Sequence, residues 1–336
     1  MAQRKKISIR MIADTCGVST ATVSRVINNE NNVTEETRHL VLDAVERLGY
    51  IPPLPAPGSP KVDKIGVIIT ASTSDYYHAV LASIGKYFRR MDISVVAMNT
   101  EQTAGYLPRA MDTLYDCNIQ GLILVSCDYL SVRDKIYQKI PHVWIDCNDP
   151  EDATPHICRV QSDHYIAGKL AAQELFQKGC TKPVMITGSV ITHRTEERIR
   201  GFVDGSAAAG IHINAEQIIH LPNIKSQIAE SKEMIRYMAA KGMLFDSIFA
   251  DSDARMLGSY EGVRSMGYSI PGDVRIIGFD GISDAVTGVL NISCIQQNVT
   301  LLTQSACEML LQLIHKQSLT KSSVVIPVNI LPGQTL

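Results

Sequence analysis

The sequence contains no hydrophobic run of the roughly 20 residues that a transmembrane helix requires. No apolar stretch follows the basic residues near the N-terminus, so we expect no secretory signal peptide. The 32 basic and 34 acidic residues nearly cancel to a net charge of −2, which excludes a uniformly basic nucleic-acid binder. From these absences we predict a cytoplasmic chain that makes no contact with a membrane.

Metal-binding and catalytic motifs are also missing. The eight cysteines form no Cys-x-x-Cys pair, and no histidine cluster has the spacing of metal ligands. We therefore expect reduced thiols, no metal and no cofactor. The chain has no nucleophile elbow, no phosphate-binding loop and no Gly-x-Gly-x-x-Gly motif after a strand. An α/β enzyme that merely carries a helical hairpin is the alternative, which turnover of a candidate sugar would support.

The most informative segment lies between residues 9 and 28, where the spacing predicts two short helices joined by a turn. Gly17 stands where a tight turn requires a positive φ, and Ser19 can cap the second helix. Apolar residues mark the face on which the two helices pack, namely Ile12, Ala13, Val23, Val26 and Ile27. The outer face keeps short polar residues and Arg25, which suit base edges and phosphates in a major groove. An ordinary helical hairpin with a solvated face is the alternative.

Two features beside this hairpin favour DNA binding. A third helix is predicted from residue 35 to residue 48, with Thr34 as its N-cap and Gly49 as its stop. Residues 1–28 hold five basic residues and one acidic residue, a local charge of +4 on a nearly neutral chain. Such a patch can face phosphates, although a solvated tail would have the same composition.

A linker and a long α/β region follow. Residues 52–63 contain five prolines and one glycine, which prevents an uninterrupted helix. From Lys64 onward, β-rich runs alternate with helix-sized stretches, the pattern of parallel sheets covered by helices. The runs include residues 65–69, 93–97, 122–125, 143–145, 184–186, 247–249 and 274–278, and the helical stretches 77–90, 164–178, 198–209, 226–241, 253–267 and 298–316. This is too much chain for one sheet, so we expect two doubly wound lobes with a ligand cleft at the carboxyl ends of the strands.

The sequence resembles the LacI/GalR family of transcriptional regulators along nearly its whole length. In the first fifty residues the resemblance rests on Ser8, Ile12-Ala13, Gly17-Val18-Ser19, Thr22-Val23-Ser24-Arg25, Val26, Asn28, Val33, Thr37, Leu48-Gly49-Tyr50 and Pro52. Further along it rests on Gly121–Leu124, Asp163 with Gly168, Glu197-Arg198 with Gly201-Phe202, Ser252-Asp253 with Gly258, and Pro271 through Gly278-Phe279-Asp280.

This resemblance implies the domain organisation. An all-α helix-turn-helix headpiece spans residues 1–51, and a proline-rich hinge spans residues 52–63. An α/β two-lobed domain like the periplasmic binding proteins, with doubly wound parallel sheets, spans residues 64–336 and mediates effector binding and dimerisation. The heptad tail of tetrameric members is absent, so we expect a homodimer.

The resemblance also implies two sets of site residues. The DNA-contacting set is Ser8, Ser19, Thr20, Ala21, Thr22, Ser24, Arg25, Asn28, Asn32, Thr34, Thr37 and Tyr50. Thr20 and Ala21 are too short to fork onto a guanine, which leaves Arg25 as the guanine reader or phosphate clamp. The effector-binding set is Asp75, Tyr76, Asp146, Arg198, Ser252, Asp280 and Gln297. Strand capping and ordinary ion pairs are the alternative roles for this second set, and we assign Trp144, His78 and His193 to the core or to structural positions.

The implied function is that of a homodimeric repressor of transcription, bound to double-stranded operator DNA and controlled by a sugar, sugar phosphate or polyol. A corepressor-type or protein-partnered catabolite regulator, in which the ligand promotes DNA binding, is the alternative. The hinge departs from the family, because Ser59 stands where an apolar wedge is usual and prolines surround it. We therefore expect an extended linker and a weakly kinked operator, unless Leu54 replaces the wedge.

Overall fold

The computed structural model describes residues 8–27, 33–48, 62–71, 74–101, 103, 105–136, 140–222, 226–282, 290–319 and 321–336. The chain divides into two compact units, residues 1–59 and residues 60–336. Residues 52–61 of the linker, including Leu54 and Ser59, lie outside the described residues, as do Asn28, Asn32 and Tyr50 of the DNA-contacting set. Within the described segments no helix is both long enough and apolar enough to cross a membrane.

The described part of the first unit consists of α1 (Ile9–Cys16), α2 (Thr20–Ile27) and α3 (Glu35–Leu48). Gly17 ends α1 with φ of 66°, and its N–H donates to the carbonyl oxygen of Ala13. This is the turn that the sequence predicts, since a residue with a Cβ would be strained there. The three helices share one small core, formed by Ile12, Ala13, Val23, Val26, Val41, Ala44 and Val45.

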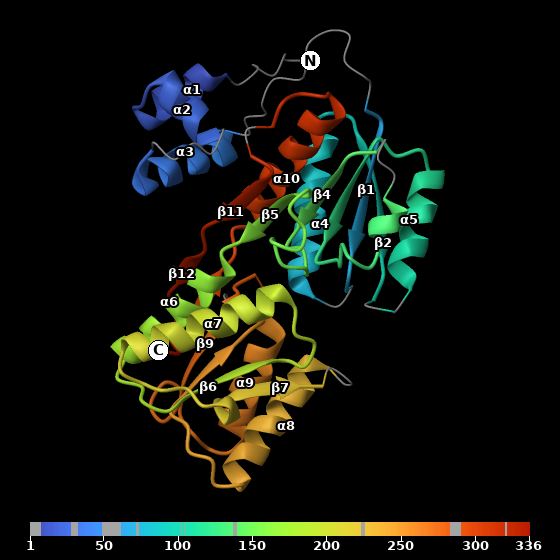
Figure 1. Cartoon of the computed structure of the whole chain (residues 1–336). Coiled ribbons are helices and arrows are strands. Elements are labelled where there is room, and N and C mark those ends of the chain that lie inside the picture. The colour runs from blue at the N-terminus through green and yellow to red at the C-terminus, as the bar shows by residue number, and fades with distance from the viewer. Residues whose placement is uncertain are drawn as a thin grey trace. The chain divides into compact units, whose positions relative to one another are not determined.

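The second unit contains two lobes, each built on a six-stranded sheet (Figure 1). The order in lobe 1 is β11 (Ser323–Ile326), β5 (Cys158–Ser162), β4 (His142–Ile145), β3 (Gly121–Val125), β1 (Lys64–Ile69) and β2 (Ser94–Asn99). The order in lobe 2 is β12 (Asn329–Leu331), β10 (Cys294–Gln296), β9 (Arg275–Asp280), β8 (Ser247–Ala250), β6 (Pro183–Gly188) and β7 (Ile218–Leu221). All pairs are parallel except β10 with β12. The predicted α/β class with doubly wound sheets is confirmed.

Helices cover both faces of each sheet (Figure 1). In lobe 1, α4 (Asp75–Arg89) and α10 (Val299–Ile314) share a core with one face, and α5 (Tyr106–Asp116) packs on the other. In lobe 2, α8 (Gln227–Ala240) and α9 (Asp253–Ser265) cover one face, and α6 (His164–Gln177) and α7 (His193–Ala208) cover the other. Short 3₁₀ turns lie at Arg133–Lys135 and Ala215–Gln217.

Three chain segments pass between the lobes, from β5 into α6, from β10 into α10, and from β11 into β12. Ser162 ends β5 where the first crossover begins, and Gln297 stands in the second crossover. The crossovers are short and hold the two lobes close together. Residues of both lobes therefore contribute to the region between the two sheets. The site described below lies there.

The helices α6 and α7 approach each other closely at two glycines. A Cβ on Gly168 would overlap the carbonyl oxygen of Arg198, and a Cβ on Gly201 would overlap the carbonyl oxygen of Tyr165. Only glycine allows the two backbones this proximity. The positions of His164 and Arg198 relative to each other are therefore set by backbone packing.

The seven β runs that the sequence indicates correspond to β1, β2, β3, β4, β6, β8 and β9, and the six helical stretches correspond to α4 and α6–α10. The helix α5 and the strands β5, β7, β10, β11 and β12 were not among the predicted segments. The strand β5 alternates Arg159 and Gln161 with apolar residues, and β10 and β12 are only three residues long. Trp144 is 1% exposed and belongs to the core, as predicted, and all eight cysteines are free thiols.

Candidate functional site

The outward face of α2 carries short polar groups and one guanidinium. Ser19, Thr20, Ala21 and Arg25 are exposed, whereas Thr22 and Ser24 are half-buried. Val23 and Val26 point the opposite way into the core. The helix thus presents to solvent the residues that the sequence assigns to DNA, in the arrangement expected for a recognition helix.

Several hydroxyls of the predicted DNA-contacting set also cap helices. Ser8 Oγ accepts from the Met11 N–H at 3.4 Å, and Ser19 Oγ accepts from the Thr22 N–H at 3.0 Å. At α3, Thr34 Oγ1 accepts from the Thr37 N–H at 3.3 Å. The hydroxyls of Thr22 and Thr37 each lie 2.8 Å from the hydroxyl of the capping residue. These side chains therefore organise helix N-termini, which are themselves suited to phosphate.

In the second unit, three polar residues stand in a row at the carboxyl edge of the lobe 1 sheet. Thr70 follows β1, Ser126 follows β3 and Asp146 follows β4. The strand registers make these three residues lateral neighbours, since Ile68 pairs with Leu124 and Val125 with Ile145. Ser126 and Asp146 both have positive φ, 57° and 48°, so the backbone turns at the same level after β3 and after β4. Such an edge is where α/β sheets bind ligands.

Asp146 is fully buried and accepts three hydrogen bonds. Tyr76 donates its hydroxyl to Oδ2 at 2.5 Å, the Ser162 N–H donates to Oδ1 at 3.0 Å, and His164 Nε2 lies 3.1 Å from Oδ1. Burial alone would raise the pKa of Asp146, but His164 and its hydrogen bond hold that pKa well below the usual range. Asp146 is therefore a carboxylate whose oxygens are occupied by the chain's own donors.

His164 connects Asp146 of lobe 1 to Arg198 of lobe 2. Its Nδ1 lies 2.9 Å from Arg198 Nη1, and burial lowers its pKa to about 4. Arg198 also stacks over Phe279 at 4.5 Å from the ring centroid and approaches Asp251 at 3.9 Å. A continuous series of side chains, from Tyr76 through Asp146, His164 and Arg198 to Asp251, thus spans the two lobes.

A second arginine of α7 lies one turn before Arg198. Arg194 Nη2 donates to Asn148 Oδ1 at 2.8 Å, and Asn148 Nδ2 donates to the carbonyl oxygen of Ser126 at 2.7 Å. The backbone N–H of His193 also donates to the Asn148 carbonyl at 3.0 Å. Burial would lower the pKa of Arg194, but Tyr77 and Asp146 raise it, and the net change is upward. Arg194 is therefore a cation held against the carboxyl edge of lobe 1.

Gln297 joins the same network from the second crossover. Its Nε2 donates to Asp280 Oδ1 at 2.8 Å, and its Oε1 accepts from Ser162 Oγ at 2.6 Å. Burial, followed by the charge of Asp253, raises the pKa of Asp280 to about 7. Asp280 can therefore act as a donor or an acceptor near neutral pH.

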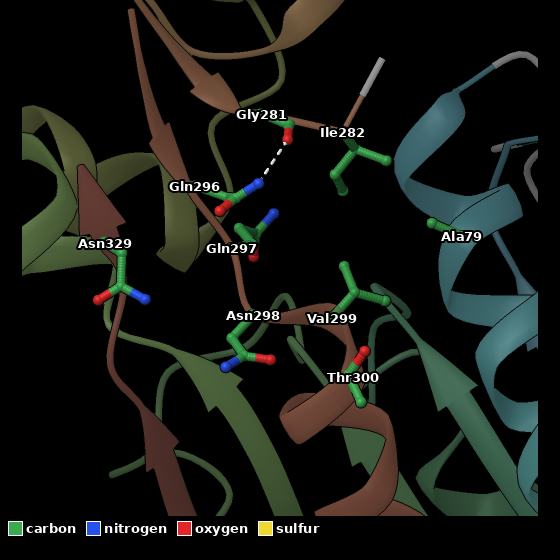
Figure 2. Close-up of a pocket in the computed structure, with 9 residues that line it drawn as sticks. All are labelled: Ala79, Gly281, Ile282, Gln296, Gln297, Asn298, Val299, Thr300 and Asn329. Atoms are coloured by element: carbon green, nitrogen blue, oxygen red, sulfur yellow. Dashed lines mark hydrogen bonds between the residues drawn. The ribbon is translucent and has the colours of Figure 1, made fainter. Parts of the chain in front are cut away.

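A pocket of about 420 Å³ opens beside Gln297. Figure 2 shows Gln297 and Asn298 on the segment that leads from β10 into α10, Val299 at the start of that helix, and Ala79 of α4 opposite them. The pocket is lined by Ala79, Gly281, Ile282, Gln296, Gln297, Asn298, Val299, Thr300 and Asn329. Gln296 Nε2 donates to the Gly281 carbonyl at 3.0 Å (Figure 2). The volume of this pocket falls within the range of small-molecule sites, and side-chain amide and hydroxyl groups dominate its lining.

The structure brings together five of the seven residues predicted to bind an effector, namely Tyr76, Asp146, Arg198, Asp280 and Gln297. Asp75 is exposed in the first turn of α4 and takes no part in this network. Ser252 caps α9 by accepting from the Arg255 N–H at 3.3 Å and donates to Gln227 Oε1 at 3.1 Å.

Sequence reasoning missed His164, Arg194, Asn148 and Asp251. The signal for Asp251 was its place at the end of β8, and the signal for Arg194 was its spacing of four residues from Arg198. Across the described ranges, no group of three His, Cys, Asp or Glu side chains could hold a metal ion.

Family models match both parts of the chain. Residues 8–53 match the model of bacterial regulatory proteins of the lacI family, and residues 62–333 match periplasmic binding proteins and the sugar-binding domain of the LacI family. The chain is 27% identical over 326 residues to the HTH-type transcriptional repressor PurR of Glaesserella parasuis, covering 95% of this chain and 94% of that protein. It is 26% identical over 317 residues to the ribose operon repressor of Escherichia coli, covering 93% and 94%.

Solved structures share the fold. The Lac repressor dimer bound to operator and the anti-inducer ONPF superposes with a TM-score of 0.72 at 22% identity, covering 98% of this chain and 99% of that one. The complex of the transcriptional regulator CelR with cellobiose also gives a TM-score of 0.72, at 20% identity, covering 98% and 100%. These likenesses extend over both units.

Proposed function

Because the chain belongs to the LacI family and is therefore a DNA-binding transcriptional regulator, we propose that it represses transcription by binding double-stranded operator DNA as a homodimer. The family consists of regulators, so the enzyme alternative is set aside. We place this activity in the cytoplasm. The proposed headpiece spans residues 1–51, the hinge residues 52–63 and the effector domain residues 64–336.

The DNA-reading role is supported by the exposed face of α2. Arg25 is exposed in the last turn of a helix whose opposite side packs on α1 and α3. Its guanidinium can reach a guanine or a phosphate, and the capped N-termini of the helices can meet the backbone. The two relatives reported above are both named as repressors, which favours repression over activation.

The regulatory role is supported above all by the buried polar network between the lobes. A ligand that replaces part of this network must change the contact between Asp146 and Arg198 through His164, and hence the relation of the lobes. Such a ligand shifts a two-state equilibrium only by its difference in affinity for the two states, about 3–5 kcal/mol for a strong response. We propose that the effector is sugar-like and occupies this region.

Selection of binding sites from a random duplex library by the full chain tests the proposal. We expect one preferred palindromic sequence, a dimer in sedimentation, and an affinity that falls steeply with salt because phosphates are contacted. Binding without sequence preference would contradict it. Thermal-shift screening against sugars and sugar phosphates then identifies ligands, and their effect on operator affinity decides between release and corepression.

A further inference from the structure

Four hydrogen-bond donors of the site are buried and have no partner within the described part of the chain. They are Thr70 Oγ1, Ser126 Oγ, Arg194 Nε and Arg198 Nε. Thr70 is 8% exposed, Ser126 1% and Arg198 7%. A buried donor without a partner costs free energy, so four of them in one region indicate that something else supplies acceptors.

The four donors belong to one place. Thr70 and Ser126 are lateral neighbours at the carboxyl edge of lobe 1, as the pairing of Ile68 with Leu124 dictates. Arg194 and Arg198 lie one turn apart on α7, and Asn148 ties Arg194 to the Ser126 carbonyl. The two arginines are close enough for charge repulsion, since burial and then the charge of Arg194 lower the pKa of Arg198. The edge of lobe 1 that carries the two hydroxyls is therefore joined, through Asn148, to the guanidinium of Arg194 in lobe 2.

The acceptors of the same region are largely taken. Asp146 accepts from Tyr76, Ser162 and His164, as described above. Asp251 accepts from Thr187 and from Arg255 Nη1 at 3.0 Å, and it lies 3.9 Å from Arg198. The Asp253 carboxylate receives the N–H groups of Gly281 and Ile282 at 3.0 and 2.9 Å. The side-chain atoms of the site that still lack a partner can all donate a hydrogen bond. The site therefore suits a ligand that accepts hydrogen bonds.

We propose that the effector is an anion whose carboxylate or phosphate oxygens accept hydrogen bonds from Arg194, Arg198 and the hydroxyls of Ser126 and Thr70. The proposal rests on the proposed function and narrows its ligand class. A neutral polyol would bring hydroxyl donors to a region in which the carboxylates of Asp146, Asp251 and Asp253 already accept hydrogen bonds from the chain. An oxyanion instead fits the fork of a guanidinium and offsets the repulsion between two arginines one turn apart.

Matched pairs of ligands test this on the full chain by calorimetry at constant ionic strength. The probes are glucose with gluconate, glucose with glucose 6-phosphate, ribose with ribose 5-phosphate, and inorganic phosphate as the smallest anion. We expect the charged member of at least one pair to bind at least about tenfold more tightly than its neutral partner, from charged hydrogen bonds. Gluconate separates carboxylate recognition from phosphate recognition.

Two substitutions on α7 locate the binding. Arg194→Met should weaken binding of the charged probe at least about tenfold, and Arg194→Lys should restore part of it. Arg200→Met is the matched control, because Arg200 is exposed, pairs with Glu197 at 2.7 Å and stacks on Tyr165. It should leave the affinity unchanged.

Three results would overturn the proposal: no pair in which the charged member binds more tightly than its neutral partner, an Arg194→Met variant with unaltered affinity, or the binding of no anion at all. Operator affinity of the unmodified chain is measured in the same preparation. Absence of operator binding would count against the proposed function as a DNA-binding repressor. Normal operator binding without anion binding would count only against the anionic effector.

Discussion

His164 accepts a hydrogen bond on Nδ1 from Nη1 of Arg198, 2.9 Å away, while its Nε2 lies 3.1 Å from Asp146. A guanidinium can only donate, so the imidazole must be neutral and must carry its proton on Nε2. Protonation of His164 Nδ1 would point its N–H at the N–H of the Arg198 guanidinium, and the hydrogen bond between the two residues would be lost. The connection between the lobes therefore requires deprotonated His164, in agreement with the pKa that burial lowers to about 4.

The stability of the second unit should accordingly depend on pH through His164. Its pKa falls from 6.5 to about 4 on folding, so its contribution is present above the unfolded value and is lost as pH falls toward the folded value. At about 1.4 kcal/mol per unit, the free energy of unfolding should drop by roughly 3 kcal/mol more in the unmodified protein than in His164→Asn between about pH 7 and pH 4. Urea unfolding across this range measures the difference. The control His78→Asn, on the exposed side of α4, should follow the unmodified protein, and parallel curves for all three would refute the role of His164.

Glu308 should show the opposite dependence. It lies on α10, accepts from Gln304 Nε2 at 2.9 Å, and burial raises its pKa to about 7. The folded state favours the protonated form of Glu308. The contribution of this residue to the free energy of unfolding is therefore present at acidic pH and is lost as pH rises through about 7. Glu308→Gln mimics the protonated group and should raise the free energy of unfolding by about 2–3 kcal/mol near pH 8, with little effect near pH 5. The exposed Glu151→Gln is the control, and a Glu308→Gln effect that is equal at both pH values would contradict the assignment.

Ser19 combines helix capping with a position on the predicted DNA face, and two substitutions separate these roles. Ser19→Ala removes the acceptor for the Thr22 N–H and should destabilise α2 by about 1 kcal/mol, measured by amide hydrogen exchange. Ser19→Asp keeps an acceptor, so α2 should retain its protection, but the added charge should repel phosphate and weaken operator binding. Ser226→Asp, at the N-cap of α8, should leave operator affinity unchanged. If Ser19→Asp bound operator normally, Ser19 would not face DNA.

Arg25→Ala should weaken specific operator binding by about 1–3 kcal/mol and relax the preference at one base position in each half-site. The physical reason is the loss of the only guanidinium on the described face of α2. Fluorescence anisotropy with the selected operator and single-base variants provides the measurement. Arg90→Ala, at the end of α4, is the control in the effector domain. Unchanged affinity and preference in Arg25→Ala would remove α2 from the DNA interface.

The linker supports a prediction from sequence alone. Prolines at 53, 55, 57 and 60 disfavour a helix, and Ser59 is too short and polar to unstack bases. We expect the operator to be bent less than is usual in the family and Ser59→Leu to increase the bend. Circular-permutation gel mobility measures both. A strong bend in the unmodified protein that is lost in Leu54→Ala would show instead that Leu54 is the wedge.

The sequence predicts the fold well because its signals are local. Gly17 specifies the turn, Val23 and Val26 specify the inner face of α2, and uninterrupted apolar runs specify central strands. The weaker elements lack such signals. In α5, Pro108 falls in the first turn, where a proline is tolerated, and the strand β12 has only three residues and antiparallel pairing.

The candidate site is predicted less completely, since its connections are not local. Asp146 and Asp280 stand out as polar residues at strand ends. His164 follows the helix cap Asp163 and has no distinguishing pattern, yet it joins residues 18 and 34 positions away. Ser252 shows the converse, because its position at a strand end reflects the capping of α9.

The contact of α6 with α7 at Gly168 and Gly201 bears on how such a regulator can evolve. With the two backbones locked at that spacing, the side chain at position 194 can be exchanged without moving the helix that carries it. Ligand preference and lobe architecture are thereby separable traits. A library that varies residues 126, 148 and 194 while preserving both glycines should yield folded variants that answer to different small molecules, which makes this helix pair a natural starting point for building new biosensors.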